Sequence, residues 1–186
     1  SKEEKYTYAI QELSNYLGLE NIRKIEGYDV SHFSGDNAVA ACVVFSKQGP
    51  EKKSYRLFNI PKELSGNDIG SLEHVMQRRI KYYADSELKP NVILIDGGKN
   101  QLNFVNSIIN KSDHHDIKVI SIVKGSKRVR ATETIISEDG IIELDKYSKA
   151  FLILQEIRDE SHRFAIRAQR NKKRKKISRS KLDSIK

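Results

Sequence analysis

The sequence predicts an α/β protein built on a mixed β-sheet with flanking helices, and two observations carry this prediction. Three strand-like runs in the first third of the chain are joined by short turns, which favours an antiparallel meander. Further on, the nearly continuous apolar run 91–96 precedes Gly97, Gly98 and a helical pattern. Such an apolar run is typical of a central strand that is covered on both faces.

Each element is predicted from local periodicity. We expect helices where apolar residues recur at three- and four-residue spacing. We expect strands where short apolar or alternating runs are bounded by Gly, Pro, Ser and Asn. The predicted order is a helix over 4–18, strands over 24–32, 38–45 and 53–60, a helix over 69–83, a strand over 91–96, a helix over 99–110, a strand over 118–123, a hairpin of 133–136 with 141–144, and a helix over 148–168.

The composition indicates one domain with a substantial core. The chain has 186 residues, of which 38% are hydrophobic and 32% are charged. No apolar run approaches the roughly 20 residues of a membrane span, and the first residues lack the apolar core of a signal peptide. The single Cys42 lies in an apolar stretch, which predicts a core residue and fits a reducing cytoplasm. We therefore expect a cytoplasmic protein without a membrane partner.

The positive charge is concentrated in one place. The chain carries a net charge of +9, and the segment 167–181 contains nine basic residues and no acidic one. The rest of the chain is balanced, with 25 basic and 25 acidic residues. Such a block is either a solvated tail or a surface that contacts backbone phosphates. Its basic residues are Arg167, Arg170, Lys172, Lys173, Arg174, Lys175, Lys176, Arg179 and Lys181.

Two aspartates stand at or near strand ends about seventy residues apart. Asp29 lies within the strand predicted over 24–32, and Asp96 ends the strand over 91–96. Carboxylates on neighbouring buried strands repel unless a cation lies between them, and Mg²⁺ and Mn²⁺ prefer such oxygen ligands. A meander followed by a strand–helix–strand crossover around acidic strand ends suggests a ribonuclease H-like mixed sheet. Taken singly, each aspartate is also compatible with an ordinary turn or strand–helix junction.

Two further features could act on a phosphate. Gly97 and Gly98 allow backbone N–H groups to approach a phosphate, and Lys99 could reach the same group. In the final predicted helix, His162 lies close to Asp159 and directly before the basic segment. An imidazole can bind a divalent metal or act as a general base near neutral pH. A lone helical histidine is more often a surface residue, so this alternative stays open.

Several ordered motifs together resemble the C-terminal endonuclease domain of the UvrC family, which belongs to the bacterial nucleotide-excision repair nuclease. The resemblance covers about residues 10–183. The shared motifs are D-V-S-H-F-S-G-D-N, A-C-V-V-F, Y-R-L-F-N-I, V-I-L-I-D-G-G-K-N-Q-L, V-K-G and I-R-D-E-S-H-R-F-A-I, followed by basic residues. Asn100 replaces a glycine that is usual in the family.

The resemblance implies a ribonuclease H-like fold, a catalytic triad and a reaction. The implied triad is Asp29, Asp96 and His162, which would hold Mg²⁺ or Mn²⁺. Asp68 keeps the position of a further family aspartate that matters for incision, although its neighbours differ. The implied activity is incision on the 5′ side of a lesion in damaged double-stranded DNA, with UvrB and the excision repair complex as partners. The expected DNA-binding residues are Lys99, Arg163, Arg167, Arg170, Lys172, Lys173, Arg174, Lys175 and Lys176.

The expected organisation has three parts: an N-terminal helix over 1–20, the endonuclease domain over 21–170, and a basic tail over 171–186. The family's GIY-YIG nuclease domain, partner-binding segment and helix-hairpin-helix motifs have no counterpart in this sequence. We therefore expect an excised domain that is monomeric. Two alternatives stay open. One is an endonuclease V-like nuclease, which would require another carboxylate in place of His162, and the other is a non-catalytic DNA-binding or docking module.

Overall fold

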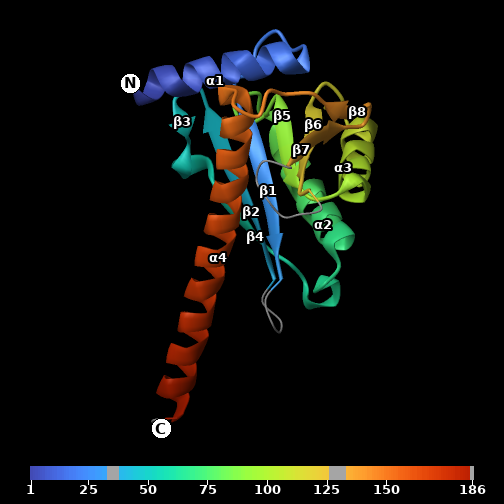
Figure 1. The fold of residues 1–186 in the computed structure, drawn as a ribbon. Coiled ribbons are helices and arrows are strands. Elements are labelled where there is room, and N and C mark those ends of the chain that lie inside the picture. The colour runs from blue at the N-terminus through green and yellow to red at the C-terminus, as the bar shows by residue number, and fades with distance from the viewer. Residues whose placement is uncertain (33–37, 126–132, 185–186) are drawn as a thin grey trace.

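A mixed eight-stranded sheet lies between two layers of helices in the computed structural model, which describes residues 1–32, 38–125 and 133–184 (Figure 1). The strands run in the order β3-β2-β1-β5-β6-β7-β8, and β4 also pairs with β2. The strands are β1 (Ile25–Ser31), β2 (Val39–Ser46), β3 (Gly49–Pro50), β4 (Arg56–Asn59), β5 (Val92–Asp96), β6 (Lys118–Val123), β7 (Thr134–Ser137) and β8 (Gly140–Ile142).

The described residues also form four α-helices and three short 3-10 helices. The α-helices are α1 (Lys2–Leu17), α2 (Asp68–Ile80), α3 (Lys99–Lys111) and α4 (Lys149–Ser184). The 3-10 helices are η1 (Lys52–Ser54), η2 (Lys62–Leu64) and η3 (Lys81–Ala84). A capping box formed by Ser1 and Glu4 begins α1, and Gly18 ends it in the left-handed conformation that is typical of a glycine after a helix.

The strand directions confirm the predicted topology. β2 pairs antiparallel with β1 and with β4, which is the predicted meander. β5 pairs parallel with β1 and with β6, as the crossover through α3 requires. Because β1, β5 and β6 are mutually parallel, their carboxyl ends lie at the same edge of the sheet. This edge is where α/β proteins commonly place their sites.

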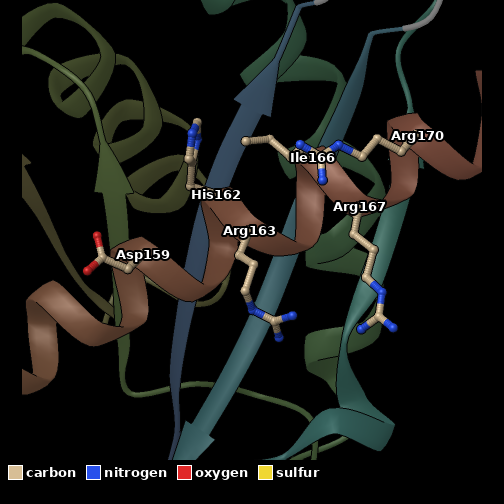
Figure 2. A pocket seen from close by; sticks show the side chains of 6 residues that line it. All are labelled: Asp159, His162, Arg163, Ile166, Arg167 and Arg170. Carbon is tan, nitrogen blue, oxygen red and sulfur yellow. The ribbon is translucent and has the colours of Figure 1, made fainter.

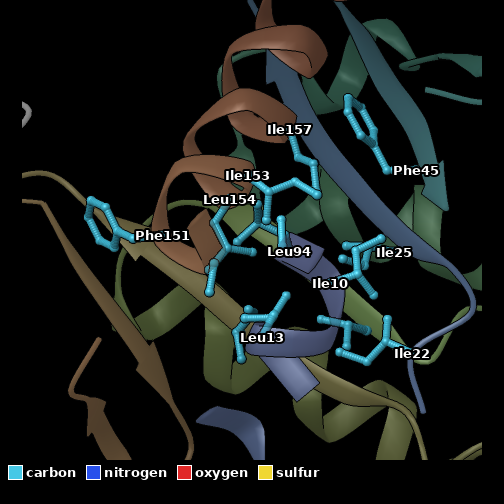
Figure 3. Packing of buried hydrophobic residues seen from close by; sticks show 14 of the residues in the cluster. Ile10, Leu13, Ile22, Ile25, Phe45, Leu94, Phe151, Ile153, Leu154 and Ile157 are labelled. Atoms are coloured by element: carbon cyan, nitrogen blue, oxygen red, sulfur yellow. The ribbon is translucent and has the colours of Figure 1, made fainter. Parts of the chain in front are cut away.

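Alternation along the strands divides the core into two layers. One apolar cluster joins α1 and α4 to one face of the sheet, and the other joins α2 and α3 to the opposite face. In β1, Ile25 belongs to the α4 side and Tyr28 to the α2 side, as a period of two requires. Figure 3 shows Ile153 and Ile157 of α4 packing over the sheet beside residues of α1. This packing places α4 across β1 and β2.

Most predicted elements are confirmed, and two differ in extent. The predicted strand over 53–60 begins as the 3-10 helix η1 and becomes extended only in β4. The final helix was expected to end near residue 168, but α4 continues through the basic segment to Ser184. Its apolar stripe ends where the prediction ended, so periodicity could not detect the extension. The predicted turn over 33–37 lies outside the described residues.

The prediction for Cys42 also holds in the described part of the chain. Cys42 is fully buried in β2, and burial raises the pKa of its thiol, which is the expected behaviour of a core cysteine. No described helix is both long enough and apolar enough to cross a membrane.

Candidate active site

Three residues meet the edge formed by the carboxyl ends of the parallel strands. Asp29 lies near the end of β1, Asp96 is the last residue of β5, and Lys124 follows β6 directly. Each continues an alternating row that faces α4, because side chains two residues apart share a face. The upstream members of these rows are Ile25 and Gly27, Val92 and Leu94, and Ile120 and Ile122. Strand direction and alternation thus direct all three residues toward α4.

The helix α4 brings His162 to this edge. His162 Nδ1 lies 3.2 Å from Asp29 Oδ2, a contact between residues 133 positions apart. The Asp29 side chain is 11% exposed, whereas that of His162 is 58% exposed. The contact therefore lies at the boundary between core and solvent, where one edge of the imidazole stays accessible. The structure brings together the first and third members of the expected triad.

Asp96, the second member of the expected triad, acts on Asp29 electrostatically. The pKa of Asp29 is raised above its usual range, chiefly because burial disfavours the charged carboxylate. The negative charge of Asp96 raises it further, while His162 and Lys124 lower it. Asp29 therefore senses one acidic and two basic neighbours. A cation between the two carboxylates would offset both the burial and the repulsion.

The donor set fits a divalent cation that takes further ligands from elsewhere. Among the described residues, no three His, Cys, Asp or Glu side chains are arranged so that they could hold a metal ion by themselves. Mg²⁺ is usually bound through one or two carboxylates, with waters and substrate phosphates completing its shell. Asp29 and Asp96 would supply the two carboxylates of such a site.

Buried polar contacts fix α4 on both sides of His162. One turn before it, the guanidinium of Arg158 forms a buried ion pair with Glu133, which directly precedes β7. Two turns after it, Gln169 Nε2 donates to the backbone carbonyl of Ser31 at the end of β1 (3.0 Å). These contacts hold the helix in register with the strand edge, and so they place His162 opposite Asp29.

The structure links Asp68 to the same edge through His32. Asp68 is the first residue of α2, and its Oδ1 lies 2.6 Å from His32 Nε2. The backbone N–H of Gly66 donates to His32 Nδ1 (3.2 Å), so Nε2 carries the proton and donates to Asp68. His32 follows Asp29 by three residues. A second His–Asp pair therefore joins the end of β1 to the start of α2.

The glycine turn after β5 differs from its expectation in one respect. The N–H of Gly98, which the sequence offered as a phosphate donor, donates to Oε1 of Gln101 (3.0 Å) and so closes a capping interaction. Gly97 lies against the Gln101 side chain, where a Cβ would sit 3.3 Å from that of Gln101. Lys99 is exposed at the first turn of α3 and remains a predicted phosphate contact.

Apart from Lys99, the predicted DNA-binding residues lie along α4. Beside the sheet edge that carries Asp29, a hollow of about 560 Å³ runs along the exposed side of this helix. In Figure 2, the side chains of Arg163 and Arg167 project to one side of α4, and that of His162 projects to another. The hollow is lined by Asp159, His162, Arg163, Ile166, Arg167 and Arg170. Arg163 also pairs with Glu160 (2.6 Å), and farther along Lys172 contacts Asn59 of β4.

Sequence reasoning missed three features of this site. Lys124 could have been found by applying to β6 the alternation that located Asp29, because it stands at the same edge and on the same face. The contact of His32 with Asp68 joins residues 36 positions apart, which local periodicity does not detect. The buried pair of Glu133 and Arg158 gives no local signal, since its members are distant in the sequence and its partners are set by how α4 packs.

Comparison with known proteins identifies the family. The family model of the UvrC RNase H endonuclease domain matches residues 14–166. The UvrABC system protein C of Legionella pneumophila (strain Paris) is 40% identical over 178 residues, which are 94% of this chain and 29% of that protein. The UvrABC system protein C of Haemophilus influenzae is 38% identical over 181 residues, which are 94% of this chain and 30% of that protein. The chain thus spans about 30% of the length of these curated relatives.

Similarity to solved structures is weaker. Human ENDOV gives a TM-score of 0.42 at 17% identity, over 57% of this chain and 47% of that one. Ciona intestinalis endonuclease V in complex with an inosine-containing DNA gives a TM-score of 0.44 at 14% identity, over 62% of this chain and 55% of that one. These overlaps are too limited to carry an argument. The matched family model and the relatives aligned over nearly the whole chain show that it belongs to the family of the UvrC RNase H endonuclease domain.

Proposed function

We propose that this chain is a divalent-metal-dependent endodeoxyribonuclease domain that hydrolyses a DNA phosphodiester. The observation that carries the proposal is the contact of His162 with the buried Asp29, next to the like charge of Asp96. A buried carboxylate with a raised pKa is costly for the fold, and such groups concentrate at functional sites. Membership of an endonuclease-domain family supports the same reading.

The residues of the chain take distinct roles in this proposal. His162 donates through Nδ1 to Asp29, which leaves Nε2 as the basic atom that accepts a proton from the attacking water. Asp29 thus fixes the orientation of the imidazole and stabilises it once it is protonated. Lys124 neutralises charge at the strand edge when the phosphate arrives. This assignment favours His162 as a general base over His162 as a metal ligand.

Asp29 and Asp96 would hold Mg²⁺ or Mn²⁺ at the edge. When bound, the ion supplies Lewis-acid polarisation of the scissile phosphate. Asp68, held by His32, acts at the neighbouring end of the edge as a further catalytic carboxylate. Backbone phosphates are bound by Lys99 and by the basic residues of α4, namely Arg163, Arg167, Arg170, Lys172, Lys173, Arg174, Lys175 and Lys176.

The biological reaction is inferred from the relatives. The matched proteins are named UvrABC system protein C, and this supports incision on the 5′ side of a lesion in damaged double-stranded DNA during nucleotide-excision repair. UvrB and the excision repair complex would deliver the damaged DNA to the domain. We propose a monomeric, cytoplasmic domain in which residues 171–186 form a basic segment distinct from the nuclease body.

A cleavage assay with matched variants tests the proposal. Asp29→Asn, Asp96→Asn and His162→Ala should each abolish cleavage of duplex DNA in Mg²⁺ or Mn²⁺ and leave the circular dichroism spectrum unchanged. Asp113→Asn and His115→Ala change exposed residues of the same types and should cleave normally. Near wild-type cleavage by Asp96→Asn would overturn the proposal.

The same assay distinguishes the alternatives. Cleavage specific to deaminated duplexes would favour an endonuclease V-like activity, although that reading requires a carboxylate where the chain has His162. Binding without cleavage in either metal would favour a non-catalytic module. To test the repair reaction, the domain within its full-length protein would be supplied with the excision repair complex and a lesion-bearing duplex. Asp96→Asn should then remove the 5′ incision specifically.

A further inference from the structure

The last part of α4 has no role in the core. The buried residues of α4 end at Gln169, and from Arg170 to Ser184 every residue except the partly covered Lys172 is exposed. Figure 1 shows α4 continuing well past the edge of the sheet, away from the rest of the molecule. We call residues 171–184 the arm. Packing against the core does not explain why the arm is a helix.

The arm is unfavourable as a helix on its own. It carries seven basic residues and one acid, Asp183. Like charges four residues apart repel on a helix surface, as Lys172 and Lys176 do, and also Lys175 and Arg179. A helix that is polar on all sides and lacks packing is marginal at this length. A ligand with negative charges distributed along its length would remove this repulsion.

The residue types favour duplex DNA as that ligand. Surfaces that bind single strands combine positive charge with aromatic side chains for base stacking, and the arm has no aromatic residue. A protein groove or a membrane surface would require an apolar stripe. The two apolar side chains of the arm, Ile177 and Leu182, are five residues apart and therefore lie roughly 140° apart around the helix. Backbone phosphates require neither feature.

The arm extends in one direction from the proposed active site, because both lie on α4. His162 and the arm belong to one continuous helix, and the hollow lined by Arg163, Arg167 and Arg170 lies between them. From His162 to Lys181 the helix rises about 28 Å, which matches roughly eight base pairs of duplex at 3.4 Å each. The arm leaves the body on one side only, so it can contact the duplex on one side of the cut.

We propose that the arm binds the phosphate backbone of duplex DNA on one side of the scissile phosphate, and that the domain therefore requires duplex on that side. The proposal rests on the nuclease function proposed above. It adds that the domain contacts the duplex differently on the two sides of the cut, which the catalytic residues alone do not imply. Because phosphate contacts carry no base information, the requirement concerns the length of the duplex and is independent of its sequence.

The test compares two variants with the same change in charge. In the arm variant, Lys173, Arg174, Lys175, Lys176, Arg179 and Lys181 become Gln, which keeps helix propensity and spares Lys172 with its contact to Asn59. In the control variant, Lys2, Arg23, Lys52, Lys53, Lys81 and Lys111, all exposed, become Gln. Both variants lose six positive charges and should keep the folded body.

The first readout is the position of cuts on end-labelled blunt duplexes. The wild type and the control variant should make no cuts within roughly eight base pairs of one end of the labelled strand, while cutting closer to the other end. In the arm variant this one-sided exclusion should disappear. A symmetric exclusion, or one that persists in the arm variant, would overturn the proposal.

The second readout is binding without metal, and it does not depend on cleavage. If about three arm charges contact phosphates, the log–log salt slope on duplex should become shallower by roughly 2.7 in the arm variant and change less in the control. Equal slope changes in both variants would overturn the proposal, and so would competition by polyglutamate as strong as that by duplex. If the wild type cut no DNA, the nuclease proposal would fail, while this readout would still decide the role of the arm.

Discussion

The helix α4 lies so close to β1 that position 27 has no room for a side chain. A Cβ built on Gly27 would lie 2.4 Å from Ile157 Cγ2 and 3.2 Å from Val43 Cγ2, well inside the ordinary carbon–carbon contact of roughly 3.5–4.0 Å. Ile157 is completely buried, so it has little freedom to rotate away. In Gly27→Ala, α4 must therefore move by about 1 Å relative to β1.

The expected loss of stability follows from two opposing effects. Inserting a methyl group into a packed core costs about 1–3 kcal/mol, whereas replacing a strand glycine by alanine recovers about 0.5–1 kcal/mol of chain entropy. We expect Gly27→Ala to lower the free energy of unfolding by about 1–2 kcal/mol, measured by urea denaturation. For a chain of this size the melting temperature should fall by roughly 2–8 °C.

The effect on activity should be larger than the effect on stability. His162 lies five residues after Ile157 on the same helix, so a displacement of α4 changes the 3.2 Å contact with Asp29. Misplacing a catalytic group by 1 Å can cost about 10²-fold in rate. The nuclease assay on folded Gly27→Ala should show a loss of this order.

A double variant provides the control. Ile157→Ala alone should cost about 2–5 kcal/mol, because it leaves a cavity. Combined with Gly27→Ala, it gives the new methyl group room, so the double variant should be more stable than additivity predicts and should regain activity over Gly27→Ala. The close-packing argument would be refuted if Gly27→Ala matched the wild type, or if the two effects simply added.

Two further predictions concern buried charges. Because the pKa of Asp29 is raised in the folded protein, its favourable contribution is present at low pH and is lost as the pH rises through the folded pKa. Without metal, Asp29→Asn should therefore melt at a higher temperature than the wild type at pH 7, a difference that should close in acid; equal melting curves at pH 7 would contradict this reasoning. On the opposite face of β1, Glu26 accepts hydrogen bonds from Arg79 Nε and Nη2 (3.1 and 2.6 Å) and from the hydroxyls of two tyrosines. Removing one partner of a buried pair costs about 3–5 kcal/mol, so urea denaturation of Glu26→Gln should show a loss of this size, while the exposed Glu87→Gln should change stability by under about 0.5 kcal/mol.

The parts of the fold that the sequence predicts well depend on short-range periodicity. Alternation in β1 correctly separates Asp29 from its apolar neighbours, and the apolar run before Gly97 correctly places Asp96 at a strand end. Apolar spacing locates α1, α2 and α3 to within a few residues, because each helix buries one face. In these elements, local preference and tertiary burial agree, so the local signal is sufficient.

The parts that the sequence could not predict depend on distant contacts. No local signal shows that the Arg158 guanidinium meets Glu133, or that Gln169 caps the end of β1, because both contacts exist only after α4 has docked. The continuation of α4 beyond Ala168 was missed for a different reason, because there the local signal disagrees with the structure. There the apolar period stops and like charges accumulate, so sequence preference predicts a tail where the structure has a helix.

The row of residues in β1 that faces α4 shows why packing and chemistry cannot be separated here. Gly27 lets the helix approach, and two residues later the same row presents Asp29 to His162. A larger residue at 27 would relieve the entropy cost of glycine but move the imidazole away from the carboxylate. Burial of Asp29 is likewise unfavourable without a cation, yet it is the same burial that fixes the geometry of the pair. Both unfavourable features, the strand glycine and the buried carboxylate, therefore occur at one strand end, which is expected of residues that serve the proposed reaction more than the stability of the fold.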